Sequence, residues 1–182
     1  MSTPPRVFIY GFGPYRQFRA NITARIIRSL PRDPLLKRKI FPVRFHRRQF
    51  VGALERIRPD MILGLGQSAR RRIEVETRAA NRRRARAADA PKPIAANGPA
   101  WLKTTWLPKL GRGAGPSQNA GDYVCNFSMY VMLDHLRRRK LETPYAFVHI
   151  PHDCEWQKAA AAVARILRGV RARHRTRRAQ RK

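Results

Sequence analysis

The sequence predicts an α/β fold with three layers, in which a central, twisted and mostly parallel sheet carries helices on both faces. Apolar runs typical of strand, helix, strand, helix and strand follow one another early in the chain, joined by short links. This alternation is the pattern of parallel α/β proteins. The chain has 182 residues, of which 43% are hydrophobic. That length and composition suit a single domain with a sizeable core.

Proline and glycine residues mark the expected ends of helices and strands in the first part of the chain. The first buried strand is expected at residues 6–10, and apolar side chains at helical spacing follow at residues 21–30, where Pro31 blocks continuation. Gly66 closes the last strand of this part. The elements between Pro31 and Gly66 are expected to be a strand at 39–43, a helix at 49–57 that stops near Pro59, and a strand at 61–65.

The second part of the chain is less regular at its start. Residues 90–116 are rich in Pro, Gly and Ala, yet they contain Trp101 and Trp106. The tryptophans indicate an ordered segment that packs either on the body of the protein or on a partner subunit of a homo-oligomer. The elements that complete the domain are expected to be an extended stretch at 73–79, a long apolar helix that carries Cys125, a strand at 145–151 and an amphipathic helix at 156–169.

The end of the chain differs in composition from the rest. Residues 171–182 are almost entirely basic and polar. Such a segment cannot bury enough apolar surface to offset its ordering entropy. The sequence therefore predicts one α/β domain at residues 1–170 and a disordered basic tail at 171–182.

Cys125 is a candidate nucleophile. It follows a glycine turn at Gly121 and precedes a long apolar run, so it is expected in the first turn of a largely buried helix. Backbone N–H groups point outward there, and the helix dipole favours a thiolate. The alternative is that Cys125 is a small buried hydrophobe, as free cysteines often are.

Two further residues complete a candidate set with Cys125. His149 lies at the C-terminal end of a short apolar strand, and α/β proteins form their sites at that end of the sheet. A histidine there could deprotonate the thiol, and a carboxylate at Glu76 could orient the imidazole. Taken singly, a structural histidine and a solvated glutamate are the commoner cases. Together the three residues form a Cys/His/acid set on separate elements, as nucleophilic catalysis requires.

Four blocks of the sequence carry a family resemblance. They are Gly11-Phe12-Gly13-Pro14-Tyr15 with Asn21; a turn at Gly66-Gln67-Ser68; the stretch from Ile73 through Glu76 to Arg86; and residues 119–130 together with 147–151, where the Cys-to-His spacing also matches. In this order the blocks resemble the pyroglutamyl peptidase I family of cysteine peptidases, over about residues 6–170.

The resemblance implies roles for individual residues. Cys125 would be the nucleophile, His149 the general base and then acid, and Glu76 the residue that orients the histidine. The family removes an N-terminal pyroglutamate from peptides through an acyl-enzyme, without metal or cofactor, so the implied partner is a peptide of this kind. The positions that match the family's pyroglutamyl pocket are Phe12, Tyr15, Gln67, Tyr123 and Val124, and Arg86 matches an arginine near the site.

The sequence also departs from the family pattern. Arg16 and Arg70 stand where the family has glycines, which puts bulk and positive charge near the predicted pocket. These changes favour an alternative hypothesis: a catalytically weak or inactive homologue that binds an anionic partner through its basic surface. Retention of Cys125, His149 and Glu76 favours the enzyme, because a binding module does not need all three.

Composition narrows the remaining function classes. The formal charge is +29, from 40 basic and 11 acidic residues. The arginines are spread along the chain and no nucleic-acid-binding motif is recognised, so we expect non-specific binding to polyanions rather than a dedicated nucleic-acid function. Gly11-Phe12-Gly13 lacks the third glycine of a dinucleotide loop, and Pro14 breaks that fingerprint.

Cysteine usage and hydropathy indicate the compartment. The only cysteines are Cys125 and Cys154, without a Cys-x-x-Cys motif, which argues against a disulfide framework and against structural zinc. The spacing of His149, His152, Asp153 and Cys154 fits no standard metal site, so no metal is expected. No signal-like or membrane-spanning run is present. A cytoplasmic location is therefore expected, which would keep a catalytic thiol reduced.

Overall fold

The structure is a computed structural model in which strands and helices alternate much as the sequence predicts. It describes residues 4–15, 18–111 and 113–179, with side chains up to residue 170. The helices of this part of the chain are α1 (Ile22–Ser29), α2 (Arg47–Ile57), α3 (Val124–Arg138) and α4 (Trp156–Ala179). The strands are β1 (Val7–Phe12), β2 (Leu36–Phe41), β3 (Met61–Ser68), β4 (Glu74–Glu76), β5 (Arg78–Ala80), β6 (Trp101–Lys103), β7 (Gly115–Ser117) and β8 (Tyr145–Pro151).

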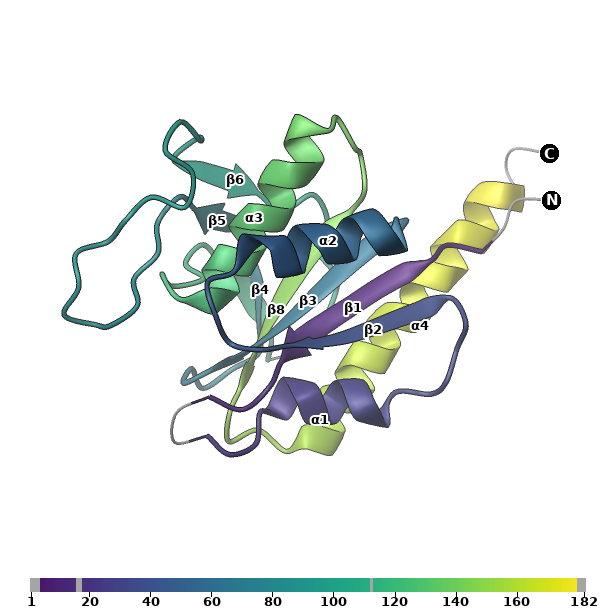
Figure 1. Cartoon of the computed structure of the whole chain (residues 1–182). Helices are drawn as coiled ribbons and strands as arrows, with labels where there is room; N and C mark the ends of the chain where they lie inside the picture. The colour runs from purple at the N-terminus through teal and green to yellow at the C-terminus, as the bar shows by residue number, and fades with distance from the viewer. Residues whose placement is uncertain (1–3, 16–17, 112, 180–182) are drawn as a thin grey trace.

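The main sheet has the strand order β2-β1-β3-β8-β4-β7. β1, β2, β3 and β8 are mutually parallel, β4 runs antiparallel to β8, and β7 is parallel to β4. From β2 the chain crosses over β1 to reach β3. Because strand–helix–strand crossovers are right-handed, α1 and α2 lie on opposite faces of the sheet, as Figure 1 shows. The predicted three-layer α/β fold with a mostly parallel sheet is confirmed.

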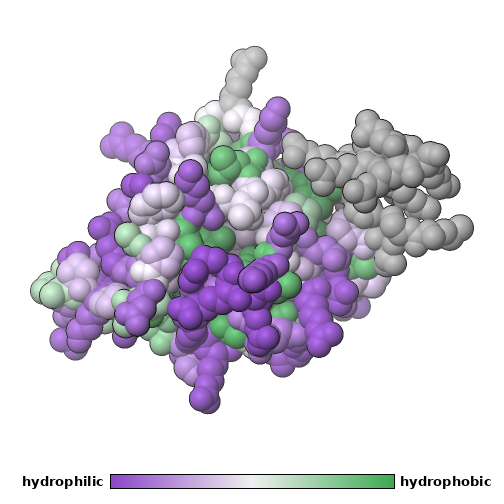
Figure 2. Space-filling view, turned by 90° about the horizontal axis from the view of Figure 1, so that it is seen from above, coloured by the Kyte–Doolittle hydropathy of each residue, from purple (hydrophilic) through white to green (hydrophobic). Residues whose placement is uncertain are grey.

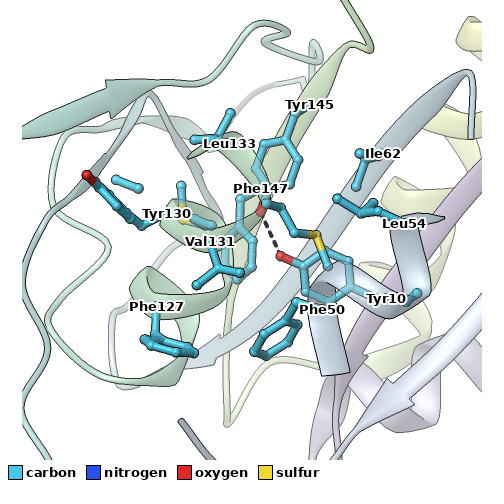
Figure 3. Close-up of a cluster of buried hydrophobic side chains, with 14 of the residues drawn as sticks. Tyr10, Phe50, Leu54, Ile62, Phe127, Tyr130, Val131, Leu133, Tyr145 and Phe147 are labelled. Atoms are coloured by element: carbon cyan, nitrogen blue, oxygen red, sulfur yellow. Dashed lines mark hydrogen bonds between the residues drawn. The ribbon is translucent and has the colours of Figure 1, made fainter. Parts of the chain in front are cut away.

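Each face of the sheet has its own apolar core. On one face α1 and α4 contribute Ile26 and Val163 to a cluster of aliphatic side chains. On the other face α2 and α3 cover an aromatic cluster around Tyr10 and Phe50 (Figure 3). The buried Tyr10 and Tyr145 hydroxyls join by a hydrogen bond of 2.6 Å, drawn as the dashed line in Figure 3. The site described below lies at one end of this aromatic core, where α3 begins.

Local sequence signals set the helix ends. The Asn21 side chain caps α1 by accepting a hydrogen bond from the Thr23 N–H at 3.0 Å. At the end of α2, Arg58 adopts the left-handed conformation with φ of 47°, and its N–H donates to the Leu54 carbonyl at 2.8 Å. Pro59 follows and prevents the helix from continuing.

Several predicted boundaries are wrong. The strand predicted at 39–43 lies at Leu36–Phe41, because it pairs in register with the whole of β1. The predicted turn at Gly66-Gln67-Ser68 is the end of β3, which continues to Ser68 in register with β8. The predicted stretch at 73–79 is divided into β4 and β5. In each case pairing with a neighbouring strand, which a single segment cannot reveal, sets the boundary.

The middle segment contains regular structure, in agreement with the ordered segment that its tryptophans indicate. β6 pairs antiparallel with β5 as a second, two-stranded sheet beside α3 (Figure 1). Trp106 packs against the aliphatic core, so the prediction that this segment packs on the body of the protein is confirmed for this residue. Trp101 remains 46% exposed. Packing of this segment on a partner subunit stays a prediction.

The last helix is longer than predicted. The helix expected at 156–169 runs as α4 to Ala179, so the backbone of residues 171–179 continues it. Residues 180–182 lie outside the described part of the chain, and the disorder of the 171–182 tail stays a prediction. Within the described residues, no helix combines the length and apolar character needed to cross a bilayer.

Candidate active site

Cys125 lies in the first turn of α3, as predicted. The chain enters the helix through Gly121, whose φ of 77° is a conformation that favours glycine. Tyr123 is the N-cap residue and makes no side-chain capping hydrogen bond. The first intrahelical bond runs from the Phe127 N–H to the Tyr123 carbonyl at 2.9 Å. The backbone N–H groups at the start of the helix, beside the partly exposed Cys125 thiol, can therefore serve as donors to a bound carbonyl oxygen.

His149 and Glu76 come together in the neighbouring strands β8 and β4. His149 is 4% exposed and Glu76 is fully buried. The Nδ1 atom of His149 lies 2.7 Å from Oε1 of Glu76, so the imidazole donates its Nδ1 proton to the carboxylate. This hydrogen bond fixes the orientation of the ring and leaves Nε2 as the nitrogen that can form a hydrogen bond with the thiol.

Gly66 brings Cys125 and His149 together. It lies opposite His149 in the parallel pairing of β3 and β8. A Cβ atom at position 66 would lie 2.7 Å from Cδ2 of His149 and 2.9 Å from Sγ of Cys125, closer than carbon can approach either atom. The thiol and the imidazole therefore meet over the space that the missing side chain of Gly66 leaves.

The charges of these groups favour an ionised set. Burial alone would lower the pKa of His149, but hydrogen bonds with Cys125 and Glu76 outweigh it and raise the pKa to about 9. Burial alone would raise the pKa of the Glu76 carboxyl, but the hydrogen bond and charge of His149, with smaller effects of Ser117 and Arg70, hold that pKa below its ordinary value. At neutral pH the imidazolium is thus the stable form of His149 beside Glu76.

Arg70 contacts the acid of this set. Its guanidinium donates to Glu74 and, at 3.0 Å, to Oε1 of Glu76. It also donates to Ser117 Oγ at 2.9 Å and to the Asn119 carbonyl. The expected positive charge near the site is present, and it is paired with carboxylates. Arg16, the other replaced glycine, lies outside the described residues.

Two of the predicted pocket residues are buried in the free protein. Phe12 is 1% exposed and packs edge-on against Tyr10 and Phe50. Val124 is likewise buried, at the start of α3. Gln67 is partly buried at the end of β3, where its side-chain carbonyl accepts a hydrogen bond from the Ile22 N–H at 3.0 Å. Gln67 thereby ties β3 to the start of α1, and the pocket roles of all three residues stay predictions.

The other predicted pocket residues lie on loops. The rings of Tyr15 and Tyr123 are 5.0 Å apart, so the N-terminal loop meets the start of α3 next to Cys125. Arg86 is exposed on the loop after β5, and its backbone N–H donates to Asp89 at 2.9 Å. Its role near the site also stays a prediction.

Asn126 is a residue of this region to which the sequence analysis gave no role. Its buried side chain accepts from the Ala80 N–H and donates to the carbonyls of Ala80 and Arg82, each at 2.8 Å. It thus fastens the first turn of α3 to β5. An amide next to Cys125, in a largely apolar helix, is the signal that could have indicated this contact.

The two cysteines should differ strongly in reactivity. The pKa of Cys154 is raised by burial and by the neighbouring carboxylates of Asp153 and Glu155. Cys125 instead lies beside the His149 imidazolium. Brief treatment with iodoacetamide near neutral pH should therefore label Cys125 far faster than Cys154, as measured by peptide mass spectrometry. Equal labelling, or faster labelling of Cys154, would contradict an activated thiol at position 125.

Known proteins are similar in sequence to this chain over half of its length or more. The family model described as Pyroglutamyl peptidase matches residues 5–163. The pyrrolidone-carboxylate peptidase of Erwinia tasmaniensis is 35% identical over 115 residues, which are 54% of this chain and 53% of that protein. The pyrrolidone-carboxylate peptidase of Pyrococcus furiosus is 29% identical over 168 residues, 81% of each chain. The match thus spans about half the length of the first relative and most of the second.

Solved structures share the fold. A pyrrolidone carboxyl peptidase from Thermococcus litoralis superposes with a TM-score of 0.81 at 20% identity, covering 95% of this chain and 96% of the other. A mutant pyrrolidone carboxyl peptidase from Pyrococcus furiosus has a TM-score of 0.78 at 23% identity, covering 92% of this chain and 98% of the other. At these identities the likeness concerns the fold alone. The family match extends over well more than half of the sequence, and the chain therefore belongs to the pyroglutamyl peptidase family.

Proposed function

We propose that the protein is a cysteine peptidase that removes an N-terminal pyroglutamate (5-oxoproline) from peptides. Cys125 is the nucleophile, His149 the general base and acid, and Glu76 the residue that orients His149. The observation that carries the proposal is the joined set of contacts in a chain of this family: the Glu76–His149 hydrogen bond of 2.7 Å and the meeting of His149 with Cys125 over Gly66.

Acylation uses the ion pair of Cys125 and His149. The thiolate attacks the carbonyl carbon of the amide bond that joins the pyroglutamyl residue to the rest of the peptide. The oxygen of this carbonyl becomes an oxyanion that accepts hydrogen bonds from N–H groups at the start of α3. As the intermediate collapses, the carbon–nitrogen bond breaks and His149 gives its Nε2 proton to the departing amine. The products of this half-reaction are a free peptide and a pyroglutamyl thioester on Cys125.

Hydrolysis then restores the enzyme. His149, now neutral, removes a proton from a water molecule that attacks the thioester carbonyl. The carbon–sulfur bond breaks, pyroglutamate leaves, and the Cys125 thiolate and the imidazolium are regenerated. Glu76 keeps the same ring nitrogen protonated throughout, because its carboxylate holds the Nδ1 proton in both half-reactions.

Recognition of the substrate follows from the chemistry of the lactam ring, which is flat, largely apolar and uncharged. Aromatic side chains at Tyr15 and Tyr123 supply flat surfaces beside Cys125, and Gln67 supplies an amide for the polar edge of the ring. A free N-terminal amine is rejected, because burying an unpaired ammonium costs several kcal/mol. The proposed pocket also includes Phe12, whose ring reorients when substrate binds, and Val124, which contacts the substrate. Arg86 is proposed to lie near the bound substrate.

A pair of amides tests this function. The protein should hydrolyse a chromogenic pyroglutamyl amide and leave the corresponding prolyl amide, whose ring nitrogen is a charged amine, at least about a hundredfold less reactive. Chelation with EDTA should not change turnover, because no step uses a metal. If several pyroglutamyl amides yield no product above the background of Cys125→Ser, the peptidase proposal fails and the inactive-homologue hypothesis replaces it.

The setting of the reaction is also part of the proposal. We propose a cytoplasmic location, where a reducing environment keeps Cys125 as a thiol. The charge of +29 leads us to propose non-specific binding to polyanions, consistent with the hydrophilic side chains that cover much of the face in Figure 2. This binding should weaken steeply with added salt, whereas hydrolysis of an uncharged pyroglutamyl amide should not.

A further inference from the structure

The guanidinium of Arg70 connects three parts of the site that are distant in sequence. It follows β3 and donates to the carboxylates of Glu74 and Glu76 on β4. It donates to Ser117 Oγ at the end of β7. Its second terminal nitrogen donates to the carbonyl of Asn119, in the loop that leads to Cys125. A planar group with several donors suits such a junction better than a single ammonium would.

Arg70 and His149 share one oxygen of the proposed acid. Oε1 of Glu76 lies 2.7 Å from Nδ1 of His149 and 3.0 Å from Nη1 of Arg70. Two donors on one oxygen hold the fully buried carboxylate from two directions. The position of that oxygen relative to the imidazole therefore depends on Arg70 as well as on the backbone of β4.

Through its contact with Asn119, Arg70 also holds the loop that leads to the nucleophile. The Asn119 side-chain oxygen accepts a hydrogen bond from the Gly121 N–H at 3.1 Å, and the backbone N–H of Asn119 donates to Ser117 Oγ at 3.2 Å. Gly121 forms the turn that leads into α3 and Cys125. Arg70 is thus bound both to the acid and to the loop that places the thiol.

We propose that Arg70 is a positioning residue, whose guanidinium holds Glu76 against His149 and fixes the loop ahead of Cys125. The inference rests on the proposed function. Arg70 acts through Glu76 and the loop, and none of its contacts reaches the thiol or the imidazole directly. Arg70 stands where the family has a glycine, so this set of contacts is a feature that the replacement introduces in this chain.

The charges around Glu76 determine in which direction its pKa should move when Arg70 is replaced. The cations that face it are His149 from β8 and Arg70 from the segment after β3, while Glu74 on β4 is the neighbouring carboxylate and is itself paired with Arg72 at 3.4 Å. On α3, Cys125 faces His149. Removing the cation at Arg70 leaves two neighbouring carboxylates with less compensation, so the pKa of the Glu76 carboxyl must rise.

The test compares Arg70→Met with Arg70→Lys, and uses Arg71→Met, at an exposed neighbouring position, as the matched control. Arg70→Met should lower kcat by about tenfold with KM within about twofold of wild type, and should move the acid limb of the pH profile up by about one pH unit. Arg70→Lys keeps the charge but cannot reach all four acceptors, so its acid limb should stay near wild type while kcat falls a few-fold. Arg71→Met should behave as wild type.

Each outcome decides the inference. Wild-type kcat and an unmoved acid limb in Arg70→Met would overturn it, as would equal effects of Arg71→Met. If Arg70→Met does not fold, as judged by circular dichroism, Arg70→Lys decides, and wild-type kcat in that variant overturns the inference. If the wild-type chain itself shows no turnover, the proposed function fails. Nitrogen NMR of the His149 imidazole then still tests Arg70, because the titration of Glu76 sensed at His149 should move to higher pH in Arg70→Met and stay unmoved if the inference is wrong.

Discussion

Replacement of Cys125 by serine should lower kcat for a pyroglutamyl amide by at least about a thousandfold. A serine hydroxyl has the same place at the start of α3, but it is a far weaker nucleophile than a thiolate and cannot form the ion pair with His149. KM should change much less than kcat, because the substitution leaves the walls of the pocket unchanged. Steady-state kinetics on the purified variant measures both constants.

The second cysteine supplies the control for this variant. Cys154→Ser should retain wild-type turnover, because the Cys154 thiol lies after β8 and contacts the carbonyl of Glu155 rather than the candidate site. Both variants should unfold at temperatures close to that of wild type. Substantial activity in Cys125→Ser, or a comparable loss in Cys154→Ser, would show that the nucleophile has been assigned wrongly.

Replacement of His149 by alanine should also lower kcat by about three orders of magnitude. The variant loses the proton donor for the leaving amine and the base for hydrolysis of the thioester. It should also lose the rapid alkylation of Cys125, since no imidazolium remains beside the thiol. His152→Ala is the matched control, because His152 is exposed and its ring contacts the Ser68 carbonyl at 3.2 Å. Equal losses in the two variants would contradict the role of His149.

The raised pKa of His149 predicts how wild-type activity depends on pH. Hydrogen bonds with Cys125 and Glu76 overcome the effect of burial and raise this pKa from 6.5 to about 9. Activity should therefore persist at pH 8 and fall as the pH rises through about 9, where the imidazole loses the proton that acylation needs. The same shift stabilises the fold, fully below a pH of about 6.5 and no longer once the pH has passed through about 9. Activity that is lost as the pH rises through about 6.5, with His149 intact, would contradict the ion pair.

The overall fold could be predicted because it depends on local patterns. Apolar runs at strand and helix spacing, with Pro31 and Pro59 after the first two helices, predict the order of the elements. The strand at 145–151 was predicted with its observed bounds, because a short apolar run with His149 near its end stands out in this basic chain. The candidate set of Cys125, His149 and Glu76 could be proposed from their residue types and expected elements, and the family resemblance then implied a role for each.

Features that depend on pairing between distant segments were not predicted. Gly66 and Gln67 were expected in a turn, but the length of β8 extends β3 through both residues. Phe12 belongs to β1 and packs in the aromatic core, because β1 continues two residues beyond its predicted end at Tyr10, while its pocket role stays a prediction. Arg70 was expected only to place charge near the pocket. Its simultaneous contacts with Glu76 and Ser117 depend on the pairing of β4 with β7, which the sequence does not indicate.

The measurement that tests the central claim most directly is the capture of the acyl-enzyme. With an activated pyroglutamyl ester, acylation of the thiol should outpace hydrolysis of the thioester, so that the intermediate accumulates before an acid quench. Peptide mass spectrometry should then find a pyroglutamyl group on the peptide that contains Cys125, and none on the peptide that contains Cys154. Turnover of the ester with Cys125 left unmodified, or with the group on Cys154, would contradict a mechanism that proceeds through Cys125.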